Sequence, residues 1–261
     1  MTNEEVLRIA MAQLAIDSGC TPQDFCVAEN RIVHSTASKQ ARAYLSLPFF
    51  CDLVSYGSNI VASVDPSCEK AVRDYLSRYE HVHCFETPNL HVLNDALEQY
   101  GYQVCFMAEY FLPDVKQVFP CSCGYEMRVM TPEMFAPYYR PEWSNALCEK
   151  RSQLDRLAVG AFDNGKLIGM AGASEDCASM WQIGIDVLPS YRRQGIASAL
   201  TKTLAFEILS RGIVPFYCAA WSNLASVRNA LKSGFHPAWV QLTAKSTAFV
   251  QETNAVSRGS S

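Results

Sequence analysis

Residues 187–197 read VLPSYRRQGIA, and this stretch decides the fold. An apolar strand pattern precedes it and an apolar stripe at helical spacing follows it, so the stretch turns from a strand into a helix. Gly195 has no Cβ and lets the backbone approach a bound group closely. A helix N-terminus adds about half a positive charge at the same place, and Arg192 and Arg193 add cationic donors. Together these features predict a loop that binds a pyrophosphate.

The residues around this loop predict a mixed, mostly antiparallel α/β sheet with flanking helices. Residues 163–165, Asp-Asn-Gly, are a strong hairpin signal between two apolar runs. The helix that starts after Gly195 is closed by Gly212. The expected order in this half is β-α-α-β-β-β-α-β-α-β. Strands are expected over 125–130, 157–162, 167–173, 180–187, 213–220 and 235–242, and helices from 131, over 143–154, after 195 and over 224–231.

The N-terminal half predicts a smaller α/β domain. Thr2 and Glu5 fit a capping box at the start of a helix. Residues 49–65 are rich in Val, Ile, Tyr and Phe around a Gly-Ser-Asn turn, which predicts two strands. Prolines and polar residues over 113–124 indicate a domain boundary. The expected organisation is an α/β domain over 1–124, a second domain over 125–246 and a flexible tail over 247–261.

Composition excludes several classes of protein. The chain has 261 residues, of which 49% are hydrophobic and 18% charged, so it can bury an ordinary core and is not a disordered chain. Its 22 basic and 26 acidic side chains give a net charge of -4, and it has no long basic run, so nucleic acid is not an expected partner. The longest apolar stretch, 213–221, is too short to span a bilayer, so no membrane partner is expected either.

The cysteines do not predict a disulfide scaffold. There are eleven, an odd number, scattered from Cys20 to Cys218, and the acidic start of the chain has no apolar signal-peptide core. These features favour a cytoplasmic protein with reduced thiols. Two short clusters, 81–84 and 121–123, hold His and Cys, but neither has a second half at zinc-site spacing. No metal is therefore expected.

The loop motif carries a resemblance to a known family. Arg192-x-x-Gly195-x-Ala197 lacks the Gly-Lys-Ser/Thr of a Walker A loop and the three glycines of a dinucleotide-binding loop. It resembles the Gln/Arg-x-x-Gly-x-Gly/Ala motif of the GCN5-related N-acetyltransferases (GNATs). In that family the loop holds the pyrophosphate of acetyl-CoA, so the resemblance implies acetyl-CoA as cosubstrate.

Two neighbouring segments strengthen the resemblance, which covers about residues 125–246. Residues 185–187, with Pro189 two positions later, look like the family strand that opens to pair with pantetheine. Asn223 followed by Ser-Gly-Phe at 233–235 looks like the family's Asn-containing helix and its Gly-Phe end. The resemblance implies that the following residues bind the cosubstrate: Ile185, Asp186, Val187, Arg192, Arg193, Gln194, Gly195, Ile196, Ala197, Ser198, Asn223 and Ser226.

The implied reaction is direct attack of an amine on the thioester. The amine must be neutral, whereas a lysine-type amine has a pKa of about 10.4, so a base or a water relay must take a proton. We prefer Glu142 as that base, with Glu175 next, although most carboxylates are simply solvated. The backbone N–H of Val187 is the expected donor to the oxyanion.

The sequence departs from the family pattern at both the acid and the base. Many GNATs carry Tyr seven residues after the helix Asn, where this chain has Ala230. Ser226 is a third candidate catalytic residue, although a hydroxyl is a weak acid. Some members place Glu where this chain has Trp181. Asp186 faces the other side of the strand from Val187, and a hydrogen-bonded structural role for it is an equal alternative.

Two functions of different classes follow. The first is an N-acetyltransferase that acts on a small-molecule amine in a ternary complex; the alternative is a non-catalytic acyl-CoA sensor. A third function, amino-acid transfer from tRNA as in tandem relatives, is disfavoured by the acidic composition. The whole chain also resembles a two-domain GNAT subgroup that includes the zwittermicin A resistance acetyltransferase, which suggests an antibiotic as acceptor. The oligomeric state stays open.

The N-terminal half contains an echo of the second domain. Residues 89–102 and 223–235 share an Asn-Leu start, an Ala-Leu pair seven residues later and a Gly-aromatic end. Either the N-terminal half is a degenerate GNAT-like copy, or the echo reflects only the common pattern of Asn-capped helices that end in Gly. It has no phosphate loop of its own, and we expect it to help select the amine.

Overall fold

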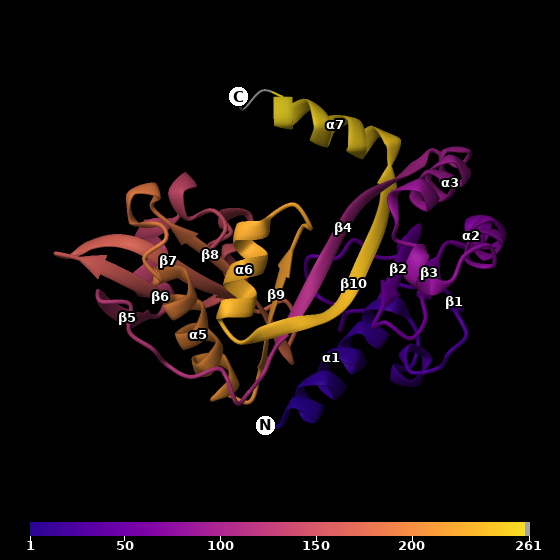
Figure 1. Cartoon of the computed structure of the whole chain (residues 1–261). Coiled ribbons are helices and arrows are strands. Elements are labelled where there is room, and N and C mark those ends of the chain that lie inside the picture. The colour runs from indigo at the N-terminus through magenta and orange to yellow at the C-terminus, as the bar shows by residue number, and fades with distance from the viewer. Residues whose placement is uncertain (259–261) are drawn as a thin grey trace. The chain divides into compact units, whose positions relative to one another are not determined.

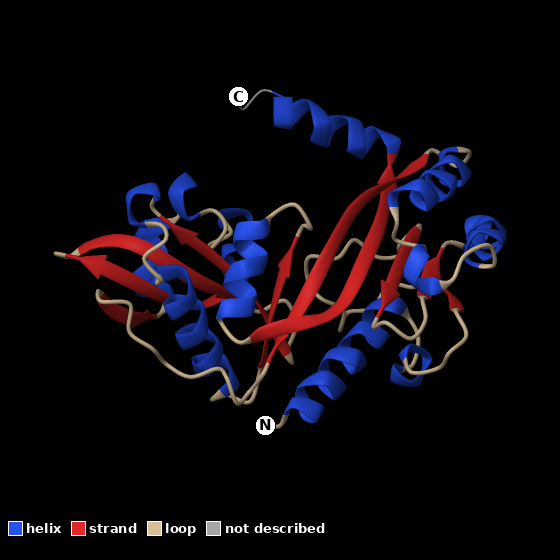
Figure 2. Ribbon diagram, viewed as in Figure 1, coloured by secondary structure: helices blue, strands red, loops and turns tan. Residues whose placement is uncertain are grey.

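The computed structural model describes residues 1–258, which form two compact units (Figures 1 and 2). Unit 1 consists of residues 1–10 and 110–238, and unit 2 of residues 11–109 and the described residues from 239 on. The boundaries between the units therefore fall within helix α1 and within strands β4 and β10. The domain assignment made from the sequence, with its boundary near 124, stays a prediction.

Unit 1 holds a sheet in the strand order β4-β9-β8-β7-β6-β5. The pairs β5–β6, β6–β7 and β7–β8 are antiparallel, and β8–β9 is parallel. The mixed, mostly antiparallel sheet predicted from the sequence is confirmed. The elements of this unit are β4 (Tyr102–Pro113, from residue 110), β5 (Glu126–Met130), α4 (Pro132–Phe135), β6 (Asp155–Asp163), β7 (Lys166–Ser174), β8 (Met180–Val187), α5 (Ile196–Leu209), β9 (Val214–Ala219) and α6 (Leu224–Lys232).

The hairpin between β6 and β7 forms where the sequence places it. Asp163 pairs with Lys166 across a two-residue turn, in which Asn164 has φ 49° and Gly165 has φ 80°. Positive φ at both turn residues matches the right-handed twist of the flanking strands, and Asn-Gly accepts it at little cost. This hairpin sets the register in which β6 and β7 pair.

Helix α5 packs on the face of the sheet formed by β6, β7 and β8. Ile196, Leu200 and Leu204 are buried there in the main apolar cluster of unit 1. A Cβ on Gly169 in β7 would lie only 3.0 Å from Ile196 Cγ2 and 3.1 Å from Leu200 Cδ1. The absence of a side chain at 169 therefore lets the first turns of α5, and with them the loop before the helix, approach the sheet closely.

Unit 2 is also α/β, as predicted. Its strand order is β1-β3-β2-β10-β4, with β2–β3 and β2–β10 antiparallel and β1–β3 parallel. Strands β2 and β3 are the pair predicted over 49–65. The elements are α1 (Asn3–Ser18, from residue 11), β1 (Arg31–His34), β2 (Cys51–Ser55), β3 (Val61–Val64), α2 (Glu69–Leu76), α3 (Thr87–Glu98), β4 (to residue 109), β10 (Phe235–Ser246, from residue 239) and α7 (Thr247–Arg258).

Three local expectations can be compared with these elements. The single helix expected over 143–154 is wrong, because only the short 3-10 helices Pro141–Trp143 and Glu149–Leu154 form there. The tail expected from residue 247 contains α7, and residues 259–261 lie outside the described residues. The internal duplication stays a prediction. No helix among residues 1–258 is long and apolar enough to cross a membrane.

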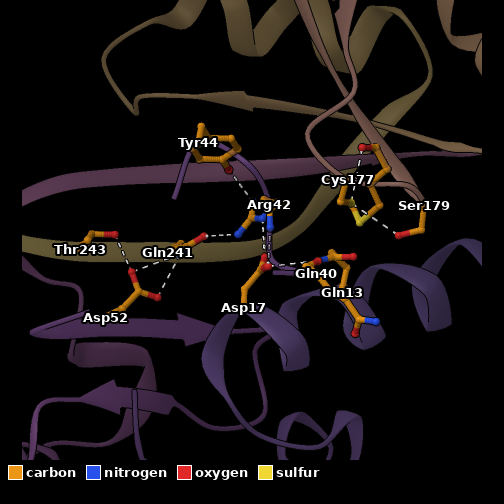
Figure 3. Close-up of polar contacts among 11 residues, drawn as sticks. Gln13, Asp17, Gln40, Arg42, Tyr44, Asp52, Cys177, Ser179, Gln241 and Thr243 are labelled. Atoms are coloured by element: carbon orange, nitrogen blue, oxygen red, sulfur yellow. Dashed lines mark hydrogen bonds and ion pairs between the residues drawn. The ribbon is translucent and has the colours of Figure 1, made fainter. Parts of the chain in front are cut away.

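A buried polar network holds unit 2 together (Figure 3). Arg42 Nε donates to Asp17 Oδ2 at 2.5 Å, and both side chains are almost fully buried. The Arg42 guanidinium also donates to Gln241 Oε1 at 3.1 Å, and Gln241 Nε2 donates to both carboxylate oxygens of Asp52 at 3.0 and 3.1 Å. Thr243 donates its hydroxyl to Asp52 as well. The network thus ties α1, β2 and β10 to the loop that carries Arg42.

We expect Asp52 to make the stability of the protein depend on pH. Burial raises the pKa of Asp52 to about 6, although Thr243, Gln241 and Arg42 act in the opposite direction. The folded-state pKa lies above the unfolded one, so the stabilisation that comes from protonation is complete in acid and is lost as the pH rises through about 6. That loss is on the order of 3 kcal/mol.

Asp52→Asn replaces the carboxyl with a neutral group of the same shape. Its free energy of unfolding should gain on that of the wild type as the pH rises from about 4 to 6.5, because only the wild type must ionise a buried carboxyl. Urea unfolding at several pH values measures the difference. A difference between the two proteins that stays constant over this range would contradict the assignment.

Candidate active site

The loop between β8 and α5 has the backbone geometry of an anion site. After the short 3-10 helix Pro189–Tyr191, Arg193 has φ 64° and Gly195 has φ 83°. Backbone that alternates between right- and left-handed conformations turns successive N–H groups toward one point and forms a nest for an anion. A Cβ on Gly195 would meet no other atom within 4 Å. The space that a phosphate needs beside this residue is therefore open.

The N–H groups at this loop are free to bind a ligand. Among the described residues, no backbone hydrogen bond from the N–H groups of residues 193–198 is present. The first backbone bond of the helix runs from Ala199 N to Gly195 O at 3.1 Å, and Ser198 Oγ donates to the same carbonyl at 3.0 Å. These orphan donors lie at the positive end of the helix dipole. The predicted residues Arg193 to Ser198 are thus brought together at one N-terminus.

Three side chains that the sequence did not single out hold the loop in place. Tyr191 donates its hydroxyl to Asp163 Oδ2 at 2.9 Å, and Tyr125 donates to Gln194 Oε1 at 2.8 Å. The two tyrosine rings meet edge to face with centroids 5.9 Å apart. Asp163 gave only a turn signal in the sequence. The predicted residue Arg192 turns back, and its Nε donates to the carbonyl of Val187 at 3.1 Å.

Strands β8 and β9 are paired over only part of their length. The pairing runs from Met180–Val214 to Gln182–Phe216, whereas β8 continues to Val187 and β9 to Ala219. Leu188 N donates to Ile168 O in β7 at 3.0 Å. Because N–H groups alternate along a strand, those of residues 183, 185 and 187 point away from β7. The edge of β8 that carries Ile185 and Val187 is therefore free of β9.

The face of β8 that carries Gly184 and Asp186 lies against the segment 143–147. A Cβ on Gly184 would lie 1.8 Å from Asn145 O, and one on Gly172 would lie 1.9 Å from Ala146 O. Only glycine permits so close a backbone contact. The sequence analysis did not identify either glycine, because a glycine inside a strand has no unique local meaning.

Asp186 fixes this segment to the strand. Its carboxylate accepts hydrogen bonds from Asn145 N at 2.8 Å, Asn145 Nδ2 at 2.7 Å and Ala146 N at 3.0 Å. Three such bonds occupy the side chain. The structural role that the sequence left open for Asp186 is therefore the one that its contacts support, and only its backbone lies on the strand expected to meet the cosubstrate.

The two candidate bases lie in different surroundings. Glu142 is exposed in the 3-10 helix next to the 143–147 segment. Glu175 follows β7, where its N–H donates to Leu154 O at 2.7 Å and its carboxylate forms an ion pair with Arg156. No described contact joins either carboxylate to Val187. Their assignment as bases stays a prediction.

Helix α6 begins beside the unpaired end of β9. Asn223 caps it, with Oδ1 accepting from Ser226 N at 3.1 Å. The Asn223 amide nitrogen makes no described hydrogen bond, so it can donate to a ligand. The Ser226 hydroxyl lies 2.7 Å from the hydroxyl of Tyr217 in β9. Tyr217 carries no local motif that would have identified this contact from the sequence. No group of three or more His, Cys, Asp or Glu side chains among residues 1–258 could hold a metal ion.

Comparison with known proteins agrees with this geometry. Residues 125–235 match the model of the acetyltransferase (GNAT) family. This segment is similar to a GNAT domain. The match begins just before β5 and ends at the start of β10. It includes the loop after β8, the unpaired strand edge and the cap of α6.

Solved structures of similar fold come from several bacteria. A GNAT-family acetyltransferase from Novosphingobium aromaticivorans is 19% identical to this chain. The match covers 55% of this chain and 66% of the Novosphingobium chain, with a TM-score of 0.43. A GCN5-related N-acetyltransferase-like protein from Streptococcus suis is 20% identical, covers 60% and 69%, and has a TM-score of 0.45. The aminoglycoside N-acetyltransferase AAC(6')-Iy, in complex with CoA, is 20% identical, covers 45% and 91%, and has a TM-score of 0.36.

This chain thus spans about two thirds of the Novosphingobium protein. A comparison with curated protein sequences finds no match.

Gly195→Val should abolish phosphate binding by the GNAT loop. The new side chain would occupy the open space beside residue 195 and would strain a backbone with φ 83°. CoA affinity should fall by about tenfold or more. Gly165→Val is the matched control, because Gly165 has φ 80°, also has open space and lies in the hairpin turn. Equal CoA affinity of the two folded variants, measured by calorimetry, would remove the loop from the site.

Asp186→Ala should loosen the 143–147 segment and spare the phosphate loop. The N–H groups of Asn145 and Ala146 would lose their acceptor, at a cost of roughly 1–3 kcal/mol. Hydrogen exchange at these two amides should speed up, while CoA affinity should stay within about twofold because the loop contacts the other face of β8. Unchanged exchange at residues 145 and 146 would show that Asp186 does not hold the segment.

Proposed function

We propose that the protein transfers an acetyl group from acetyl-CoA to the amine of a small molecule. The observation that carries this proposal is two sets of free backbone N–H groups, those of residues 183, 185 and 187 on the edge of β8 and those of residues 193–198 in the loop that follows. The loop suits a pyrophosphate, and the strand edge suits the amide groups of pantetheine, which pair with a backbone as another strand would. Few ligands other than CoA combine these two requirements.

The chain offers a donor for each polar part of this cosubstrate. The N–H groups of Arg193 to Ser198 would hold the pyrophosphate, and the exposed guanidinium of Arg193 would add charge at the rim. The N–H and carbonyl groups of Ile185 and Val187 would pair with pantetheine. The free amide of Asn223 would donate to the same arm from the α6 side. Contacts of the cosubstrate with Gln194 and Ile196 are proposed on the same basis.

The reaction proceeds by direct attack in a ternary complex. Glu142, or failing that Glu175, takes a proton from the amine, either directly or through water. The amine nitrogen then bonds to the thioester carbon, and an N–H on the free edge of β8 stabilises the oxyanion. Val187 is the donor expected from the sequence, and Ile185 presents its N–H on the same edge. The carbon–sulfur bond breaks last, and its electron pair leaves with sulfur.

The proposal extends to the setting of the reaction. The acceptor is a small-molecule amine, with an antibiotic as the class suggested by the likeness to the zwittermicin A resistance subgroup. The protein acts in the cytoplasm, where acetyl-CoA is available, without nucleic acid or membrane as partner. The net charge of -4 is consistent with a small cationic amine as the second substrate.

Acetyl transfer can be tested with a panel of amines. The protein is incubated with acetyl-CoA and aminoglycosides, polyamines, aminoacyl compounds or amino sugars, and acetylated products are detected by mass. Product mass is preferable to a thiol reagent because the chain itself carries eleven cysteines. CoA binding without turnover on any amine would replace the proposal with an acyl-CoA sensor. Absence of CoA binding would overturn both.

Asn223 provides a finer test, because its cap and its amide can be separated. Asn223→Asp and Asn223→Ser both keep an oxygen that caps α6 but lose the amide donor, whereas Asn223→Ala loses both. The first two should lower turnover by about tenfold with a stability change near 0.5 kcal/mol or less. If turnover per folded molecule falls only in Asn223→Ala, the residue is a cap alone.

A further inference from the structure

Tyr217 lies in β9 at the point where the pairing of β9 with β8 ends. It is the first residue of β9 beyond Phe216, the last that pairs with β8. Its side chain is 2% exposed and lies in the main apolar cluster of unit 1, with Phe235 and Ala230. Its hydroxyl nevertheless lies 2.7 Å from Ser226 Oγ in α6. The Tyr217 side chain therefore places a hydroxyl group in the apolar core, next to the ends of β8 and β9 that do not pair with each other.

Ser226 lies between this phenol and the proposed pantetheine site. Residues 223, 226 and 230 follow one another at helical spacing and share a face of α6. Asn223 is exposed, Ser226 is half-buried and Ala230 is fully buried, so the face runs from solvent into the core. Ala230 is the position where many GNATs carry a tyrosine. The small residue there leaves Tyr217 as the phenol nearest to Ser226 by a described contact.

The hydroxyl pair belongs to a larger polar cluster. Asn229 Nδ2 donates to Thr201 Oγ1 in α5 at 3.0 Å, and Thr201 is fully buried. Burial raises the pKa of Tyr217, and hydrogen bonding from Ser226 and Asn229 offsets part of this effect. The phenol thus keeps its proton throughout the neutral range and remains a donor. A buried hydroxyl would be costly at this place if phenylalanine served equally well.

We propose that Ser226 donates a hydrogen bond to the sulfur of CoA as it leaves, and that Tyr217 is the positioning residue that orients the Ser226 hydroxyl. This inference rests on the proposed acetyl transfer. The carbon–sulfur bond breaks and its electron pair goes to sulfur, while Ser226 accepts from Tyr217 and donates to the thiolate. The amine nitrogen releases its surplus proton to water, and the thiolate takes one from water, so the reaction balances without net change in either hydroxyl.

A comparison of CoA with desulfo-CoA tests this inference without an acceptor. A free thiol has a pKa of about 8.5. If Ser226 stabilises the thiolate, the ratio of CoA to desulfo-CoA affinity should rise by about tenfold between pH 7 and 9.5, which corresponds to lowering the pKa of the bound thiol by about one. Cys218 and Asp186 are the titratable groups that act on Tyr217. The wild type and all the variants keep both groups, so a difference in the ratio between wild type and variant does not come from their titration.

Four single variants and one double variant make the test specific. Tyr217→Phe and Ser226→Ala should each flatten the pH dependence of the ratio, and the double variant should be no flatter, because the two hydroxyls act as one chain. Ser226→Thr keeps the hydroxyl and should restore the rise. Tyr139→Phe is the control: Tyr139 donates to Asp155 Oδ2 at 3.0 Å in the same unit, away from this pair.

The outcomes separate the inference from the function on which it rests. A rise that is lost in Tyr217→Phe and Ser226→Ala, and kept in Tyr139→Phe, supports the relay. An unchanged rise in folded Tyr217→Phe, or no rise in the wild type, overturns it and leaves acetyl transfer standing. Failure of the wild type to bind either ligand overturns the proposed function itself. Near-ultraviolet circular dichroism at each pH verifies that the variants are folded.

Discussion

Strands β8 and β9 stop pairing with each other after Gln182, and the rest of unit 1 depends on this constraint. An unpaired backbone group costs about as much as a lost hydrogen bond when it is buried, so an interior strand normally pairs on both edges. β8 keeps its pairing with β7 from Gln182 to Val187 but loses its pairing with β9 after Gln182. A second set of free N–H groups, those of residues 193–198, follows in the loop before α5, after the paired N–H groups of Leu188, Tyr191 and Arg192. A single extended ligand could satisfy both sets.

A strand that loses one neighbour must be held by its faces, and β8 is held on both. On one face, Val187 and Ile185 pack on the apolar cluster that contains α5. On the other, Gly184 lets the backbone of the 143–147 segment lie directly on the strand, and Asp186 accepts its N–H groups. These contacts hold the 143–147 segment against this face of β8. The same aspartate thus supports the strand and shapes the segment that faces the proposed acceptor.

The sequence predicted the features whose signals are local. The Asn-Gly hairpin and the glycine at 195 depend on backbone conformations that few residues adopt, so short motifs reveal them. The contacts of Asp186 were not predictable, because Asn145 lies 41 residues away and an aspartate in a strand has no distinctive pattern. The helix expected over 143–154 is interrupted at Cys148. The backbone of Cys148 is extended, with φ -110° and ψ 95°, and its N–H donates to Asp155 Oδ2 at 3.0 Å rather than to a carbonyl of a preceding turn.

The buried network of unit 2 and the loop of unit 1 differ in how far their polar groups are satisfied by the protein. In unit 2, Arg42 forms an ion pair with Asp17, and Asp52 accepts hydrogen bonds from Gln241 and Thr243. Gln241 then links the two halves of an internally satisfied network. In unit 1, by contrast, the donors of residues 193–198 and the Asn223 amide lack described protein partners. Groups that have already satisfied one another gain little from a ligand, whereas groups left unsatisfied do gain. This difference supports the proposal that the transfer reaction takes place in the segment of unit 1 that matches the GNAT family model.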